Sequence, residues 1–283
     1  MHMVLYDVVE QIEMKSFPLP LPGEFVAIRM INESAQDEVA VVTHEGHMSI
    51  LRFGEFKTIP YPVKKATSLF IVDKLACVIP SVNETVTNVV CVDVIDRTYK
   101  ECPVQLAPAS YGYSDRQPLN HPANIALVLS HPPLAYLREY TAEDGCIKFL
   151  REGKNVWSSS RAWFSYNGSQ IFIDKGYIVP IDDLNMSEGY FFGSTNYKWF
   201  SHFNDGDHRV AALRSGSEYK VFYFSWPHTD PADYDNVPIP ANYDIVTTDQ
   251  VHACTQTLEY AIVTYKDLRN GQLQTGVAYL QFI

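Results

Sequence analysis

The sequence lacks the long apolar stretches that membrane-spanning helices need. No run of about 18 uninterrupted apolar residues occurs, so we expect no membrane span. The first residues, Met1 to Asp7, contain no basic segment followed by an apolar one, so the sequence predicts no secretory signal. We therefore expect a location of the cytoplasmic or virion type.

Basic residues are also scarce. The chain has 22 Lys and Arg against 33 Asp and Glu, for a net charge of −11. An acidic surface repels phosphate backbones, so nucleic acid is not an expected partner. The charge suits solubility, with attraction to cations or to a basic partner as the alternative interpretation.

Cysteine is sparse and shows no local pairing motif. The five cysteines are Cys77, Cys91, Cys102, Cys146 and Cys254, and no two have the CxxC spacing of a zinc knuckle or a redox pair. Most lie among apolar strand residues, as in the run from Leu75 to Ile79. We therefore expect buried free thiols, which suit a reducing compartment.

Catalytic signatures are missing as well. The chain contains no Walker A motif, no GxGxxG, no GxSxG and no HExxH. It also lacks Trp-Asp pairs at strand ends and matches no named family over a useful length. The sequence therefore gives little reason to expect an enzyme.

Helical periodicity is nearly absent, and a strand pattern repeats in its place. An apolar stretch, a charged turn and a proline recur, with prolines at Pro18, Pro60, Pro103 and Pro238. The first three intervals are 42, 43 and 135 residues, and the last equals three steps of 45. A period of about 40–45 residues in an all-strand chain is typical of propeller blades, so we predict an all-β fold, a β-propeller.

Short β-branched and aromatic runs between turn residues divide the chain into six units of about four strands each. We predict six four-stranded blades, with five or seven blades, or another all-β fold, as the alternatives. The last unit lacks a fourth strand, and residues 1–20 supply a strand that no earlier unit needs. We therefore predict one domain over residues 1–283, closed by the N-terminal strand pairing in the last blade.

The candidate binding residues are aromatic or lie in a long connector. Residues 106–124 form a proline-rich connector that carries Tyr111, Tyr113 and Arg116, and long connectors often make contacts. A dense aromatic stretch includes Tyr197 and Trp199, which at an exposed rim would bind sugars or anchor a protein. We name these five residues as candidate binding residues.

Two acidic loops are the candidate metal sites. One loop contains Asp205 and Asp207, and the other contains Asp233 and Asp235. Oxygen-rich loops with a glycine suit calcium, although the same residues are ordinary turn formers. We expect no cofactor, with Ca²⁺ at these loops as the alternative. The pair His44 and His47 is interpreted as an exposed hairpin tip.

The function hypotheses follow from this pattern. The leading one is a non-enzymatic, rigid platform for protein partners, such as a subunit of a viral or phage tail. A glycan-binding lectin is the second. A glycoside hydrolase is the third, and it requires converging acids, for which Asp73, Asp174 and Asp207 are the candidates.

Overall fold

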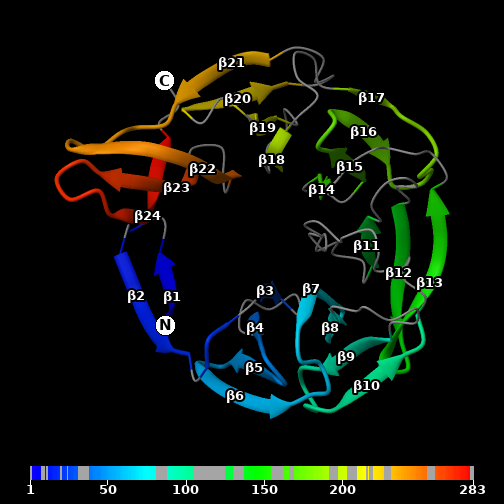
Figure 1. Cartoon of the computed structure of the whole chain (residues 1–283). Coiled ribbons are helices and arrows are strands. Elements are labelled where there is room, and N and C mark those ends of the chain that lie inside the picture. The colour runs from blue at the N-terminus through cyan, green and yellow to red at the C-terminus, as the bar shows by residue number, and fades with distance from the viewer. Residues whose placement is uncertain are drawn as a thin grey trace. The chain divides into compact units, whose positions relative to one another are not determined.

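The computed structural model consists of strands and turns, and no helix occurs in the part of the chain that it describes (Figure 1). The described residues are 2–7, 10, 12–19, 21–23, 25–30, 38–80, 88–104, 125–129, 137–153, 162–165, 169–190, 197–202, 209–214, 216, 219–225, 231–253 and 259–280. A search of these residues for a helix long and apolar enough to cross a membrane finds none.

The chain divides into two compact units, Met1–Glu152 and Gly153–Ile283, and each is considered by itself. The first unit contains a hairpin and three larger sheets, and all the strand pairs whose register is resolved are antiparallel. Its strands are β1 (His2–Asp7), β2 (Ile12–Pro18), β3 (Phe25–Met30), β4 (Glu38–His44), β5 (His47–Arg52), β6 (Glu55–Pro60), β7 (Ala66–Val72), β8 (Leu75–Pro80), β9 (Val89–Asp93), β10 (Tyr99–Cys102), β11 (Ile125–Leu129), β12 (Leu137–Glu143) and β13 (Cys146–Gly153). The sheet orders are β1-β2, β3-β4-β5-β6, β10-β9-β8-β7 and β11-β12-β13.

The second unit contains three sheets of the same kind. Its strands are β14 (Ala162–Phe164), β15 (Gln170–Ile173), β16 (Tyr177–Pro180), β17 (Gly189–Tyr190), β18 (Tyr197–His202), β19 (Val210–Arg214), β20 (Lys220–Phe224), β21 (Pro231–Asn236), β22 (Tyr243–Ala253), β23 (Glu259–Asp267) and β24 (Leu273–Leu280). They form the sheets β14-β15-β16-β17, β18-β19-β20-β21 and β22-β23-β24, in sequence order. Each sheet is a meander, because strands that follow one another in the sequence lie side by side and antiparallel.

The hairpin turns have the residues that their backbone conformations need. Between β12 and β13, Asp144 and Gly145 have φ angles of 53° and 75°. Positive φ at both central residues is the requirement of a type I′ turn, for which Asp-Gly is a preferred pair. This turn sets the path of β13 beside β12.

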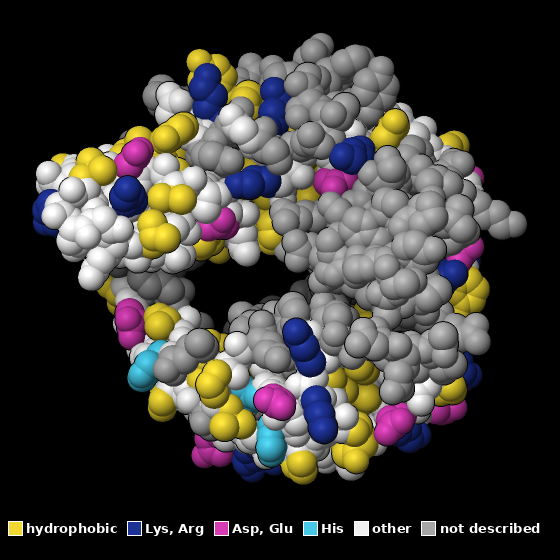
Figure 2. Space-filling view, viewed as in Figure 1, with side chains coloured by type: hydrophobic (Ala, Val, Ile, Leu, Met, Phe, Trp, Pro, Cys, Tyr) yellow, Lys and Arg dark blue, Asp and Glu magenta, His cyan; other side chains and the backbone are white. Residues whose placement is uncertain are grey.

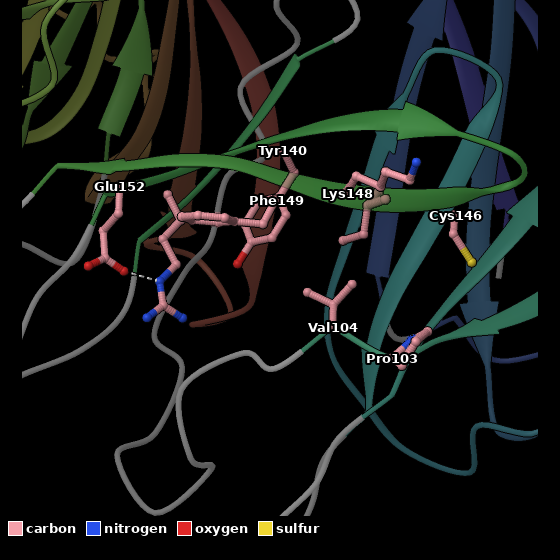
Figure 3. Close-up of a pocket in the computed structure, with 9 residues that line it drawn as sticks. Pro103, Val104, Tyr140, Cys146, Lys148, Phe149 and Glu152 are labelled. Atoms are coloured by element: carbon pink, nitrogen blue, oxygen red, sulfur yellow. Dashed lines mark hydrogen bonds and ion pairs between the residues drawn. The ribbon is translucent and has the colours of Figure 1, made fainter.

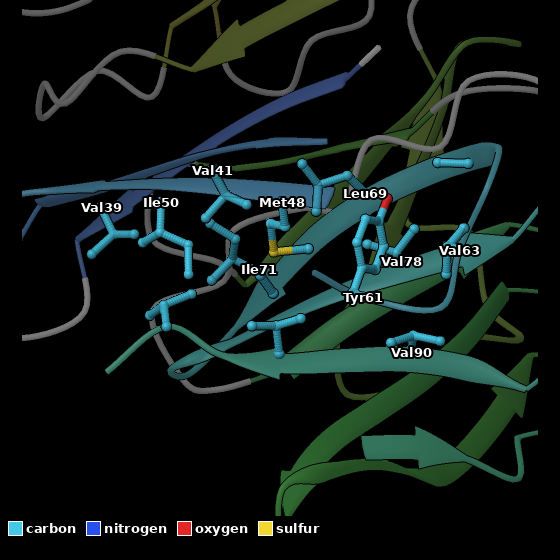
Figure 4. Packing of buried hydrophobic residues seen from close by; sticks show 14 residues of the cluster. Val39, Val41, Met48, Ile50, Tyr61, Val63, Leu69, Ile71, Val78 and Val90 are labelled. Carbon is cyan, nitrogen blue, oxygen red and sulfur yellow. The ribbon is translucent and has the colours of Figure 1, made fainter. Parts of the chain in front are cut away.

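Neighbouring sheets pack face to face inside each unit. In the first unit, one buried cluster joins β4 and β5 to β7, β8 and β9, with Met48, Ile71 and Val78 among its members (Figure 4). Leu75–Ile79 and Val89–Asp93 are buried at every position. Burial on both faces explains why these strands, apart from Asp93 at the end of β9, are apolar instead of alternating with polar residues.

The repeated prolines mark strands at sheet edges, as predicted. Pro60 ends β6, an edge strand with mostly exposed side chains, and Pro103 follows β10, the edge of the next sheet. An edge strand tolerates proline because its outer amide groups have no ladder partner to lose.

The N-terminal segment forms a hairpin with itself. His2–Asp7 pairs with Ile12–Pro18, with a register shift between Leu5 and Tyr6. The predicted strand that ends at Pro18 is therefore β2, and its described ladder is to β1. The fourth strand expected near Val156 in the third unit lies outside the described residues.

The prediction of free thiols is wrong for four of the five cysteines. Cys77 and Cys91, opposite one another on β8 and β9 with Cα atoms 4.0 Å apart, form a disulfide. Cys102, at the end of β10, forms a second disulfide with Cys146, at the start of β13. Cys254 lies outside the described residues.

The physical reason is strand pairing. The partners are 14 and 44 residues apart, so no CxxC spacing signals them, and only the β8–β9 register and the sheet packing bring them together. The expectation of a reducing compartment was based on free thiols and loses that support.

Candidate functional site

The most distinctive surface feature of the first unit is a cavity of about 560 Å³ beside β12 and β13 (Figure 3). Tyr140 of β12 and Phe149 of β13 form one side, with ring centroids 5.9 Å apart. Pro103 and Val104, which follow β10, also line the cavity. It is therefore lined by residues of two neighbouring sheets, which the Cys102–Cys146 disulfide joins.

The charged groups of this cavity are paired. Nε of Arg138 donates to Oε2 of Glu152 at 2.5 Å, and both side chains are about one quarter exposed or less. Burial opposes the charge on Arg138, but the contacts with Glu152 and Tyr140 outweigh it, so the pKa of the guanidinium lies above its usual value. Burial raises the pKa of Tyr140, although Arg138 works against that effect. The cavity therefore presents aromatic surface and a neutral ion pair.

The strand β13 is unusually exposed for its place in a sheet. Lys148, Phe149 and Leu150 are all exposed, and the fractions for Phe149 and Leu150 are 54% and 50%. By contrast β9, the third strand in order in its sheet, is buried throughout and is covered by β10 on its outer side. In the described part of the chain, β13 has a strand partner only on the β12 side. Two large apolar side chains therefore lie on the strand that is outermost among the described strands of this sheet.

A second feature is a buried acid in the second unit. Glu259 is 0% exposed, and Oε2 accepts a hydrogen bond of 2.8 Å from the hydroxyl of Tyr223 on the neighbouring sheet. Oε1 has no hydrogen-bond partner among the described residues. Burial, followed by the charge of Asp235, raises the pKa of Glu259 to about 8, against the opposing effects of Tyr223 and Arg209.

Of the predicted binding residues, Tyr111, Tyr113 and Arg116 lie outside the described residues. Tyr197 is only 3% exposed and packs on Phe200, so the expectation of an exposed aromatic platform is wrong at this position. The reason is that β18 turns this ring inward, where the guanidinium of Arg214 lies 5.6 Å from its centroid. Trp199 is half-buried and contacts Trp163 edge to face.

The predicted calcium ligands are not brought together in the part of the structure that can be described. Asp205 and Asp207 lie outside it, and Asp233 is described only as part of the β21 backbone. Asp235 is half-buried near Tyr223 and Glu259. No group of three or more His, Cys, Asp or Glu able to hold a metal occurs among the described residues.

The two histidines of the β4–β5 hairpin differ in environment. His44 is 1% exposed, and its ring nitrogens contact the carbonyl oxygen of Pro22 and Oγ of Ser49, both at 2.8 Å. Oγ of Ser49 in turn lies 2.8 Å from Oγ1 of Thr58. The exposed hairpin tip expected at this pair is therefore correct for His47 and wrong for His44, which links three strands in the interior.

The predicted catalytic acids have turn positions. Asp73 lies in the β7–β8 turn with a φ of 51°, and Asp174 lies in the β15–β16 turn and is 6% exposed. They belong to different units, and Asp207 is not described. Of the three candidates only Asp73 and Asp174 are described, one in each unit, so the described residues contain no converging pair of these acids.

The surface charge is mixed in sign. On the described residues of the face in Figure 2, Lys and Arg side chains alternate with Asp and Glu side chains and do not gather into a patch of one sign. A nucleic-acid interface would need a basic stripe. The described part of this face shows no such stripe.

Sequence reasoning missed Phe149, Tyr140 and Glu259. The run Phe149-Leu150 between Lys148 and Arg151 is apolar within a charged strand, and this was the available signal for an exposed contact. Nothing near Glu259 signals its burial, because the preceding residues are ordinary strand and turn types.

No family model and no curated protein matches this sequence. Solved structures do match. Dihydro-heme d1 dehydrogenase NirN, in complex with DHE, has a TM-score of 0.62 and 11% identity, over 99% of this chain and 71% of that one. The WD40 domain of Neurospora crassa Pan2 has a TM-score of 0.52 and 14% identity, over 92% of this chain and 80% of that one.

A chain of the mitotic checkpoint complex matches with a TM-score of 0.57 and 9% identity, over 90% of this chain and 81% of that one. At these identities the likeness shows the fold alone. The chain is an all-β protein of several small antiparallel sheets with a β-propeller fold. Because these matches include a dehydrogenase, a WD40 domain and part of an assembly, the fold leaves the function open.

Proposed function

We propose that this protein is a non-enzymatic binding platform for protein partners, and that the surface of β12 and β13 is its contact site. The observation that carries the proposal is the 560 Å³ cavity lined by the exposed Phe149. A concave apolar site next to exposed apolar side chains is typical of protein contacts. The mitotic checkpoint complex match is consistent with such a role, since propellers of that kind occur in assemblies.

The finer architecture is part of the same proposal. The six sheets of three or four strands are six blades of one domain, with the N-terminal hairpin completing the last blade. The support is that β22-β23-β24 has three strands, and the outer edge of β24 has no ladder among the described residues. The proposal includes that this rigid platform is a subunit of a larger assembly, for example a viral or phage tail.

The test is selection of binders from a library of displayed random peptides on the immobilised protein. We expect enriched peptides with apolar residues, and loss of their binding to a Phe149→Glu variant. The matched control is Phe53→Glu, because Phe53 is 68% exposed in the β5–β6 turn, away from this cavity.

Peptides that bind both variants equally, or no enrichment at all, would contradict the proposed contact site. A glycan array run in parallel checks the lectin alternative. For that alternative, and for glycoside hydrolysis, no comparable built site exists among the described residues.

A further inference from the structure

The two disulfides of the first unit differ in their access to solvent. Cys77 and Cys91 are 0% and 1% exposed, and Cys102 is also fully buried, all three within one apolar cluster. Cys146 packs against this cluster, but it is only half-buried and lines the cavity beside β12 and β13 (Figure 3). A solute in the cavity can therefore reach its disulfide through Cys146, whereas the Cys77–Cys91 disulfide is enclosed.

We propose that Cys146 is a site of thiol–disulfide exchange, and that opening the Cys102–Cys146 bond weakens binding at the cavity. The reagent is a low-molecular-weight thiol, which reacts as its thiolate. The effect on binding rests on the proposed function, because it concerns the same cavity. The exchange itself does not, because it depends only on access to one sulfur.

The exchange has two steps, and exposure decides which sulfur reacts first. The incoming thiolate attacks Sγ of Cys146, because Cys102 is buried. A bond forms between the two reacting sulfurs, the bond to Cys102 breaks, and Cys102 leaves as a thiolate that takes up a proton. A second thiolate attacks the small-molecule sulfur of the mixed disulfide and releases Cys146, which is protonated in turn. Two small thiols are thereby oxidised to one disulfide, and the protein disulfide is reduced by two electrons.

Other contacts between these two sheets do not depend on the disulfide. Nζ of Lys100 donates a hydrogen bond of 2.7 Å to the backbone oxygen of Asp144. Each of these residues lies two positions before one of the paired cysteines. Buried residues of β12 and β13 also share one apolar cluster with β7, β8 and β9. The two cysteines therefore stay close after reduction, so the bond can form again when a small-molecule disulfide is supplied.

The disulfide joins two chain segments that line the cavity. Pro103 and Val104 directly follow Cys102, and residues 147–149 directly follow Cys146. The backbone amide of Val104 donates to the backbone oxygen of Cys102 at 2.7 Å, which keeps Val104 close to the disulfide. Without the bond, the two segments gain freedom that a bound partner must remove. Ordering one or two side chains on binding corresponds to about a tenfold loss of affinity.

Access is tested with reduced glutathione on the folded, unaltered protein. Any thiol that is free at the start is first blocked with iodoacetamide. Samples are then quenched in acid at intervals, alkylated with N-ethylmaleimide, digested and analysed by mass spectrometry. We expect Cys102 and Cys146 to be labelled about tenfold faster than Cys77 and Cys91, with the transient glutathione adduct on Cys146. The Cys77–Cys91 pair is the internal control, because it reports opening of the buried cluster.

The effect on binding is tested with a peptide enriched on the unaltered protein, before and after glutathione at the dose that opens the Cys102–Cys146 bond alone. We expect Kd to rise about tenfold and to recover when oxidised glutathione is added. A variant with Cys102→Ser and Cys146→Ser should bind at the weaker level from the start and should not respond to glutathione. Circular dichroism checks that this variant is folded, and the measurement on the unaltered protein does not depend on it.

Equal labelling rates at the two disulfides, or a glutathione adduct on Cys102, would overturn the exchange at Cys146. An unchanged Kd after reduction, or a variant that responds to glutathione as the unaltered chain does, would overturn the effect on binding. If no peptide is enriched at all, the proposed function fails together with that effect, and mass spectrometry still decides the exchange.

Discussion

Glu259 provides a test of the interior of the second unit. The carboxyl is fully buried, accepts one hydrogen bond from Tyr223, and leaves Oε1 without a described partner. Replacing Glu259 with Gln keeps the size of the side chain and copies the neutral, protonated form. The variant therefore isolates the effect of ionising this group.

The magnitude follows from the pKa. Burial raises the pKa of Glu259 from its usual 4.5 to about 8, so between these values the folded protein holds a proton that the unfolded chain has released. In that window the free energy of unfolding falls by about 1.4 kcal/mol for each pH unit, about 5 kcal/mol in all as an upper value. The stabilisation is fully present below about pH 4.5 and is lost as pH rises through about 8.

The assay is urea unfolding of the native protein and of Glu259→Gln at intervals from pH 4.5 to 9. As pH rises, we expect the free energy of unfolding of Glu259→Gln to increase steadily relative to that of the native protein, by several kcal/mol over the range. Glu188→Gln is the control, because Glu188 is exposed and also accepts a single described hydrogen bond, from Gln170. Parallel stability curves for the native protein and Glu259→Gln would show that the acid ionises normally and refute the reasoning.

Three further predictions concern other parts of the chain. Replacing both Cys102 and Cys146 with Ala should lower the free energy of unfolding by about 4 kcal/mol, the loop-closure value for partners 44 residues apart. A reducing agent should lower Tm of the unaltered protein by more than that of the variant, which keeps only the Cys77–Cys91 disulfide. Replacing His44 with Leu should cost about 2–3 kcal/mol in urea unfolding, because Ser49 loses a buried partner; a cost no larger than that of exposed substitutions would contradict the network. Burial opposes the charge on Asp93, but the contact with Lys74 and the backbone hydrogen bonds from Asp96 and Ile95 outweigh it, so the pKa of Asp93 lies below its usual value. Asp93→Asn should therefore lower the free energy of unfolding at neutral pH. In acid unfolding curves this loss should shrink below about pH 4.

The strand pattern could be predicted because it is local. Runs such as Leu75–Ile79 and Glu38–Thr43 are apolar and β-branched, and turn residues such as Asp144-Gly145 separate them. The edge position of the strand ending at Pro60 also followed from a local rule, since proline lacks a ladder donor.

The candidate site was less predictable. The sequence predicts binding residues in the connector 106–124. The described cavity is instead lined by Pro103 and Val104, which precede that connector, and by residues of β12 and β13. The exposure of Phe149 depends on which strand covers β13, and a periodicity of apolar residues does not contain that information. Tyr197 was misjudged for the same reason, because its ring is buried by neighbours from β19 and β20.

The sequence alone determined that this is an all-strand chain of repeated meanders with prolines at sheet edges, because each of these features depends on residues within one or two turns. Only the tertiary structure decided that Cys77 pairs with Cys91, that Cys102 pairs with Cys146, and that Glu259 is buried against Tyr223. These contacts join residues 14 to 44 positions apart, and strand register together with sheet packing selects them.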